Sequence, residues 1–161
     1  MHEPASPSLR EQGLKWLSVI VMALLTAYSA SPLLTMLFQV AEEVTQSLGR
    51  ALMPLMLAGL ATVFVVAGMI LARRATVLQR IEAGCLWSGL LMVLTIPVMA
   101  LIVWLEASGN SGGDQGGATA AFFMLVIFGG YYMMFGGGLL VVAAILRRRR
   151  NHFGAARQVR S

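Results

Sequence analysis

Four long runs of apolar residues, separated by short polar stretches, dominate the pattern of the chain. The runs cover residues 14–31, 51–72, 83–105 and 119–146, and the last three contain no charged residue. An α-helix rises about 1.5 Å per residue, so about 20 apolar residues cross the hydrocarbon core of a bilayer. The pattern predicts an all-α integral membrane protein whose four transmembrane helices form a single domain.

The segment that follows the first run has a different pattern. Ser31 and Pro32 resemble a helix cap followed by proline at the first helical position. Apolar residues then recur every three or four positions over residues 33–48, while glutamates and glutamines fall largely on other faces. This favours a short amphipathic helix along the membrane surface. The alternative is one helix from residue 14 to about residue 40, kinked at Pro32.

The polar segments predict the orientation of the helices. Residues 1–13 and 147–161 are expected to be tails, and the glycine-rich stretch 106–118 a flexible outer loop. If the helices alternate in direction, 11 of the 12 lysines and arginines lie on the side of the two tails. Short loops rich in Lys and Arg stay in the cytoplasm. We therefore expect a protein of a bacterial inner (plasma) membrane with both termini on the cytoplasmic side. Cleavage of residues 1–29 at an A-x-A-like site remains open and would not alter this orientation.

The composition narrows the possible chemistry. Hydrophobic residues make up 58% of the chain and charged residues 12%, about half the share of charged residues in soluble domains. The single cysteine, Cys85, excludes an internal disulfide, and both histidines lie in the tails. Asp114 is the only aspartate. With so few ligands and acid–base groups, we expect no metal, no cofactor and no catalytic residues.

Small residues of the fourth run give the clearest candidate site. They form two strips with a period of seven residues, offset by one position: Gly129, Gly136 and Ala143, and Gly130, Gly137 and Ala144. Such strips let another helix approach closely, which is the main route to helix association in lipid. The contact could lie within the chain or with a second protein or a second copy of this one.

Polar side chains inside the runs are a second candidate. A phenol surrounded by hydrocarbon needs a hydrogen-bond partner, so at least one of Tyr131 and Tyr132 is expected to face another helix and bond to it. Ser88, Thr95 and the backbone near Pro97 are the expected acceptors. A small-molecule cavity lined by the tyrosines is the alternative.

The arginine run at the end of the fourth helix is a third candidate. Because Arg147, Arg148, Arg149 and Arg150 directly follow an apolar run, contact with anionic lipid headgroups is expected rather than nucleic-acid binding.

The apolar runs other than the first contain no charged residue, and this favours some functions over others. It agrees best with a non-catalytic protein that packs its helices against a protein partner. Such a protein could be an accessory subunit of a membrane complex or an immunity protein against a membrane-acting toxin. The alternative is a small oligomeric channel or carrier, which would need more polar groups to replace water along its path.

Overall fold

The computed structural model consists of four α-helices and describes residues 9–45, 52–109 and 115–158. The helices are α1 (Leu9–Thr45), α2 (Leu52–Ala72), α3 (Val77–Gly109) and α4 (Gln115–Gln158). No strand occurs in these ranges. Each helix contains a segment long and apolar enough to cross a membrane: Leu9–Ala41, Met53–Ala72, Val77–Trp104 and Phe122–Asn151. The predicted number of apolar helices is therefore confirmed.

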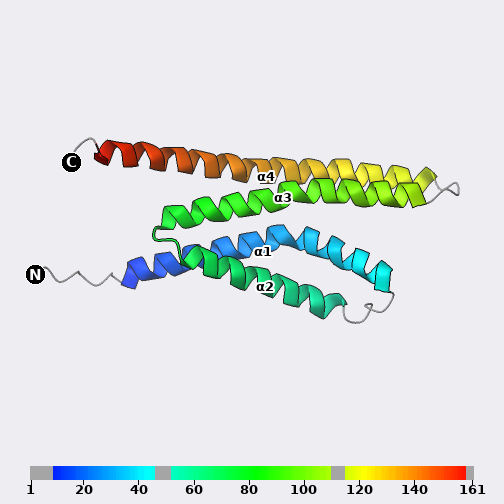
Figure 1. Cartoon of the computed structure of the whole chain (residues 1–161), viewed down its shortest axis with the longest axis horizontal. Coiled ribbons are helices and arrows are strands. Elements are labelled where there is room, and N and C mark those ends of the chain that lie inside the picture. The colour runs from blue at the N-terminus through cyan, green and yellow to red at the C-terminus, as the bar shows by residue number, and fades with distance from the viewer. Residues whose placement is uncertain (1–8, 46–51, 110–114, 159–161) are drawn as a thin grey trace, which may run out of the picture.

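The helices lie side by side in the order α2, α1, α3, α4 rather than as a closed bundle (Figure 1). α1 packs against both α2 and α3, whereas α2 barely touches α3. Within the described residues, α4 contacts only α3. Each outer helix therefore has one substantial neighbour, and much of its surface remains uncovered.

The start of α1 and the end of α4 lie at the same end of the layer, together with the turn between α2 and α3 (Figure 1). We call this the basic end, because it holds most of the basic residues of the described chain: Arg10, Lys15, Arg73, Arg74, Arg80 and Arg147–Arg150. The other end contains the α1–α2 and α3–α4 connections. The four helices thus alternate in direction, which is the arrangement that was assumed in counting the basic residues on each side.

The predicted break at Pro32 is wrong, because α1 continues through this residue to Thr45. No separate amphipathic helix follows the first run within the described residues, and residues 46–48 of that segment lie outside them. Proline leaves the carbonyl of Tyr28 without its helical N–H donor. The hydroxyl of Ser31 donates to this carbonyl at 2.8 Å. Ser31 therefore compensates for the proline instead of capping a new helix.

α1 nevertheless bends in the light-blue part of its ribbon, which contains Pro32 (Figure 1). The kinked continuous helix, kept above as the alternative, is the one observed.

The helices also extend into the predicted polar segments. α3 ends at Gly109 and α4 begins at Gln115, so only residues 110–114 of the expected 106–118 loop lie outside the described chain. α1 already begins at Leu9, and residues 1–8 of the expected tail are not described. α4 continues through the arginine run to Gln158, and residues 159–161 are not described.

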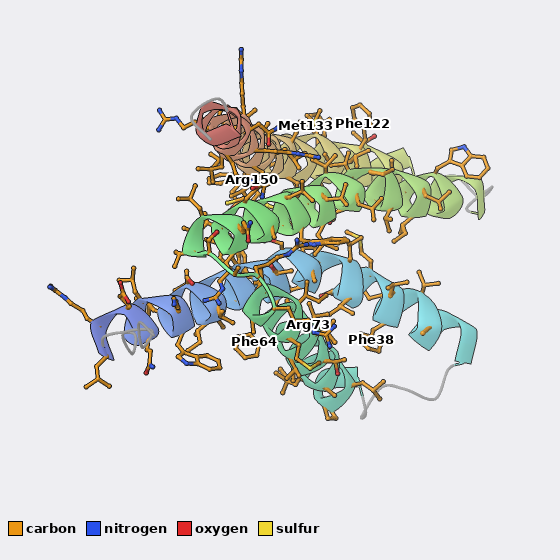
Figure 2. The ribbon with its side chains drawn as sticks, turned by 60° about the vertical axis from the view of Figure 1, so that its left-hand side comes forward. Phe38, Phe64, Arg73, Phe122, Met133 and Arg150 are labelled. Atoms are coloured by element: carbon orange, nitrogen blue, oxygen red, sulfur yellow. The ribbon has the colours of Figure 1, made fainter. Side chains whose placement is uncertain are left out.

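The core of the layer lies where α1 crosses its neighbours, and its residues are mostly small. Ala23, Ala27 and Ala30 of α1 are buried, and a cluster of Val19, Ala23 and Leu71 joins α1 to α2. Large apolar side chains instead cover the outside, among them Phe122 and Met133 of α4 (Figure 2). Small residues inside and large apolar residues outside are typical of helices that pack in lipid.

Candidate functional site

The backbones of α3 and α4 approach each other closely at Gly89 and Gly136. A Cβ atom on Gly89 would lie 2.7 Å from the carbonyl oxygen of Gly136. A Cβ atom on Gly136 would lie 2.9 Å from the Cβ of Met92 and 3.1 Å from the carbonyl oxygen of Gly89. The distances of 2.7 and 2.9 Å are shorter than real Cβ contacts, and the distance of 3.1 Å is tighter than most of them. The two glycines therefore permit a backbone contact that any other residue would push apart.

The two strips of α4 lie in different surroundings. Gly129, Gly136 and Ala143, which we call the packed strip, are buried, and Gly129 and Gly136 face side chains of α3. We call the other set, Gly130, Gly137 and Ala144, the open strip. A Cβ atom on Gly130 or Gly137 would meet no atom within 4 Å, and Ala144 is exposed. Only one of the two predicted strips is thus used for packing inside the chain.

Gly89 was not among the residues predicted from the sequence. It belongs to no seven-residue repeat, and glycine is frequent in transmembrane helices. A weaker signal was present, because Cys85 and Gly89 are small residues four positions apart. Small residues at this spacing are typical of close helix contacts.

The buried polar residues connect α1 to α3 rather than α3 to α4. The hydroxyls of Thr26 and Ser88 lie 3.2 Å apart in the interface between α1 and α3. Thr95 donates to the carbonyl of Leu91 in its own helix at 2.9 Å. Ser88 and Thr95 are both fully buried. Their hydroxyls are therefore satisfied without the tyrosines of α4.

Tyr131 and Tyr132 lie on α4, with their rings in edge-to-face contact at 5.6 Å between centroids. The ring of Tyr131 also packs against Phe135 at 4.5 Å. Neither hydroxyl makes a hydrogen bond within the described part of the chain, and 43% of the surface of Tyr131 is exposed. The structure does not bring the tyrosines together with Ser88 or Thr95.

An apolar cavity of about 290 Å³ opens between α2 and α3, with α1 as its floor. Its polar lining groups are the hydroxyls of Thr26 and Thr62 and the indole of Trp87. Thr26 is already paired with Ser88, and Thr62 donates to the carbonyl of Ala58 in its own helix. The cavity offers an apolar surface and no acid–base pair.

At the basic end, Arg80 is the main structural link between elements. Its side chain is only 8% exposed. Nε donates to the carbonyl of Arg74 at 3.1 Å, Nη1 to that of Lys15 at 3.0 Å, and Nη2 to that of Ala72 at 3.5 Å. The guanidinium thereby holds α1, the end of α2 and the following turn against α3. In the sequence Arg80 is only one of several basic residues near a turn, and no pattern there predicts its bonds to three carbonyls.

The arginine run forms part of α4 at the same end. Arg150 reaches toward the start of α3 (Figure 2), where its Nη1 lies 2.9 Å from the carboxylate of Glu82. Arg147, Arg148 and Arg149 are exposed, and the structure gives them no ion pair within the described chain. Arg150 thus fixes α4 to α3, whereas the other three arginines present charge at the surface.

No group of three histidine, cysteine, aspartate or glutamate residues that could hold a metal ion occurs among the described residues. Comparison of the chain with protein-family models, with curated proteins and with solved structures finds no match. The candidate functional features are therefore the packed and open surfaces of the helices.

Proposed function

We propose that the protein is a multi-pass protein of a bacterial inner membrane with both termini in the cytoplasm. Four helices of sufficient length and apolarity support insertion. The clustering of basic residues at the end that holds both termini supports the orientation, since basic segments are retained in the cytoplasm. In this orientation Arg147, Arg148 and Arg149 contact anionic headgroups of the inner leaflet.

We propose further that the protein acts by packing a face of α4 against a protein partner, as an accessory subunit or an immunity protein. The open strip carries this proposal. Gly130 and Gly137 present bare backbone with no atom of the chain against it, on a helix with a single neighbour. A transmembrane helix of another protein, or of a second copy, could approach this strip as closely as α3 approaches the packed strip.

The buried hydroxyls favour a partner over a conducting path. Thr26, Ser29, Ser88 and Thr95 all bond inside the chain, and each is less than 10% exposed. These hydroxyls are therefore already occupied and do not offer free polar groups to replace water. A channel or carrier would have to build its polar path between copies, from the phenols of α4.

Substitution on the open strip tests the partner proposal. Gly137→Leu places a large side chain where no atom of the chain lies, so folding should be retained while a close partner contact is lost. Val142→Leu is the matched control, because Val142 is also exposed on α4 but lies outside the open strip. The tagged protein is purified in mild detergent from the cells that produce it, and its companions are identified and quantified.

We expect a specific companion, or a dimer, that Gly137→Leu loses and Val142→Leu retains. An association that Gly137→Leu leaves intact would contradict the proposal. Solute flux through liposomes that contain only the purified protein would favour the channel instead.

Fusions test the orientation. A phosphatase that is active only outside the cytoplasm should be inactive after Ser161 and active when inserted near Gly113. A fluorescent protein that folds only in the cytoplasm should give the opposite result. Phosphatase activity at Ser161 would reverse the proposed orientation.

A further inference from the structure

A small cavity at the basic end combines basic and apolar groups. It measures about 170 Å³ and lies between the first turns of α1, the last residue of α2 and the start of α3. One water requires about 10–15 Å³, so the cavity is large enough for a chemical group. The lining residues are Gln12, Lys15, Trp16, Val19, Ala72 and Arg80.

The residues that line this cavity carry positive charge and no carboxylate, and the nearest acid along α1, Glu11, lies one turn before Lys15 and outside the lining. Arg80 is buried, and its three hydrogen bonds go to neutral carbonyls. A guanidinium has five N–H groups, so Nη1 and Nη2 each keep one further N–H after these bonds. Lys15 adds a second positive charge to the lining, and no carboxylate lines the cavity. At this end Glu82 is paired with Arg150.

A buried cation without a counter-charge is costly, and a bound anion would lower that cost. Guanidinium groups bind phosphate through parallel N–H···O bonds, which are stronger than bonds to neutral acceptors. Gln12 and the indole of Trp16 supply further donors at the rim, where both are exposed. Val19 and Ala72 make the remaining wall apolar. The lining therefore suits a phosphate that is joined to an apolar chain.

We propose that this cavity binds the phosphate group of an anionic phospholipid, with Arg80 and Lys15 as its ligands and an acyl chain along α1 and α2. The proposal rests on the proposed membrane insertion, which places Trp16 at the depth of the headgroups, where tryptophan is enriched. Two positive charges without an acid favour a lipid of net negative charge over a zwitterionic one, whose ammonium group would find no partner.

Lys15→Gln is the best test variant. The backbone carbonyl of Lys15 accepts the bond from Arg80, so the substitution removes the charge and leaves that bond in place. Arg10→Gln is the matched control, because it makes the same change of charge on the same helix at an exposed residue outside the cavity. Arg80→Gln is less informative, since it would also release α1 from the α2–α3 turn.

The full chain is purified in neutral detergent and titrated with phosphatidylglycerol, with phosphatidylcholine of the same acyl chains, and with inorganic phosphate. Native mass spectrometry counts the bound lipid. We expect one phosphatidylglycerol to bind more tightly than phosphatidylcholine, and Lys15→Gln to weaken it about fivefold while Arg10→Gln does not. Trp16→Leu should also weaken binding, because it removes a donor.

An equal loss of affinity in Lys15→Gln and Arg10→Gln would mean that general surface charge attracts the lipid, and would overturn the proposal. Equal affinity of the wild-type protein for both lipids would do the same. Binding of inorganic phosphate that blocks the lipid at equal concentration would assign the cavity to a free phosphate instead. Membrane insertion is scored separately, by resistance of the wild-type protein to alkaline extraction, so that its failure can be distinguished from failure of the lipid site.

Discussion

The Gly89–Gly136 contact predicts opposite effects of alanine at two glycines of the same helix pair. Gly89→Ala should destabilise the protein, because the new methyl group would lie 2.7 Å from a backbone oxygen and 2.9 Å from Cγ of Leu140. Gly137→Ala should be neutral or stabilising, because its methyl group would meet nothing within 4 Å.

The expected magnitudes follow from two opposing terms. Alanine in place of glycine stabilises a helix by about 0.5–1 kcal/mol, and both variants gain this term. Overpacking of a tight contact costs about 1–3 kcal/mol, and only Gly89→Ala incurs it. The two variants should therefore differ by about 1–3 kcal/mol in the free energy of unfolding. Because α3 is the only helix that α4 contacts in the described part of the chain, α4 can shift as a unit, which favours the lower half of this range.

The only cysteine of the chain provides the assay. Cys85 is 4% exposed and has a free thiol, so a thiol-reactive dye should label it only when the helices separate. Labelling is followed against temperature and against the fraction of a denaturing detergent, in the wild type and in both variants. Midpoints in the order Gly137→Ala, wild type, Gly89→Ala, from most to least stable, are expected. A Gly89→Ala protein at least as stable as Gly137→Ala would refute the contact between α3 and α4.

Three further substitutions test other contacts, with the same assay. Ser31→Ala should lower the free energy of unfolding by about 1–3 kcal/mol, because the carbonyl of Tyr28 loses its donor. In a Pro32→Ala background the backbone N–H is restored, so the same substitution should cost little. Equal costs in both backgrounds would contradict this role of Ser31. Arg80→Gln should lower the free energy of unfolding by about 1.5–3 kcal/mol, because the hydrogen bonds to three carbonyls are lost. An unchanged midpoint would show that these bonds contribute nothing to stability. Ser88→Ala should cost about 0.6 kcal/mol and at most about 1.7, with a larger loss inconsistent with a single interhelical bond.

The number of helices could be predicted from the sequence because it depends on one-dimensional information. Runs of apolar residues reveal segments long enough to cross a bilayer. The error at Pro32 came from a local ambiguity. Ser-Pro is typical of a helix start, but the same serine can also donate to the carbonyl that proline leaves free, and only the surrounding helix decides between them.

The relation between helices could not be predicted in the same way. The seven-residue period placed both strips on α4. A period shows which residues share a face of the helix, but it does not show which neighbour that face contacts. Which strip meets α3 depends on the rotation of α4, and this is set by Gly89, a residue without any repeat. Arg80 illustrates the same limit, because a basic residue near a turn usually faces water, and its acceptor on α1, the carbonyl of Lys15, is far away in sequence.

α1 and α2, like α3 and α4, are neighbours both in sequence and in space, so synthesis delivers this protein as two helical hairpins. If the protein is inserted as proposed, the face of α1 that α3 covers would lie against lipid until the second hairpin is made. The hydroxyls of Thr26 and Ser29 on α1 would not lack hydrogen bonds during this time, because they donate to the carbonyls of Met22 and Leu25 in the same helix. In a bilayer, the first hairpin could therefore wait with the hydroxyls of Thr26 and Ser29 already bonded. Halves separated within the turn at residues 73–76 and produced together should still find each other through α1 and α3.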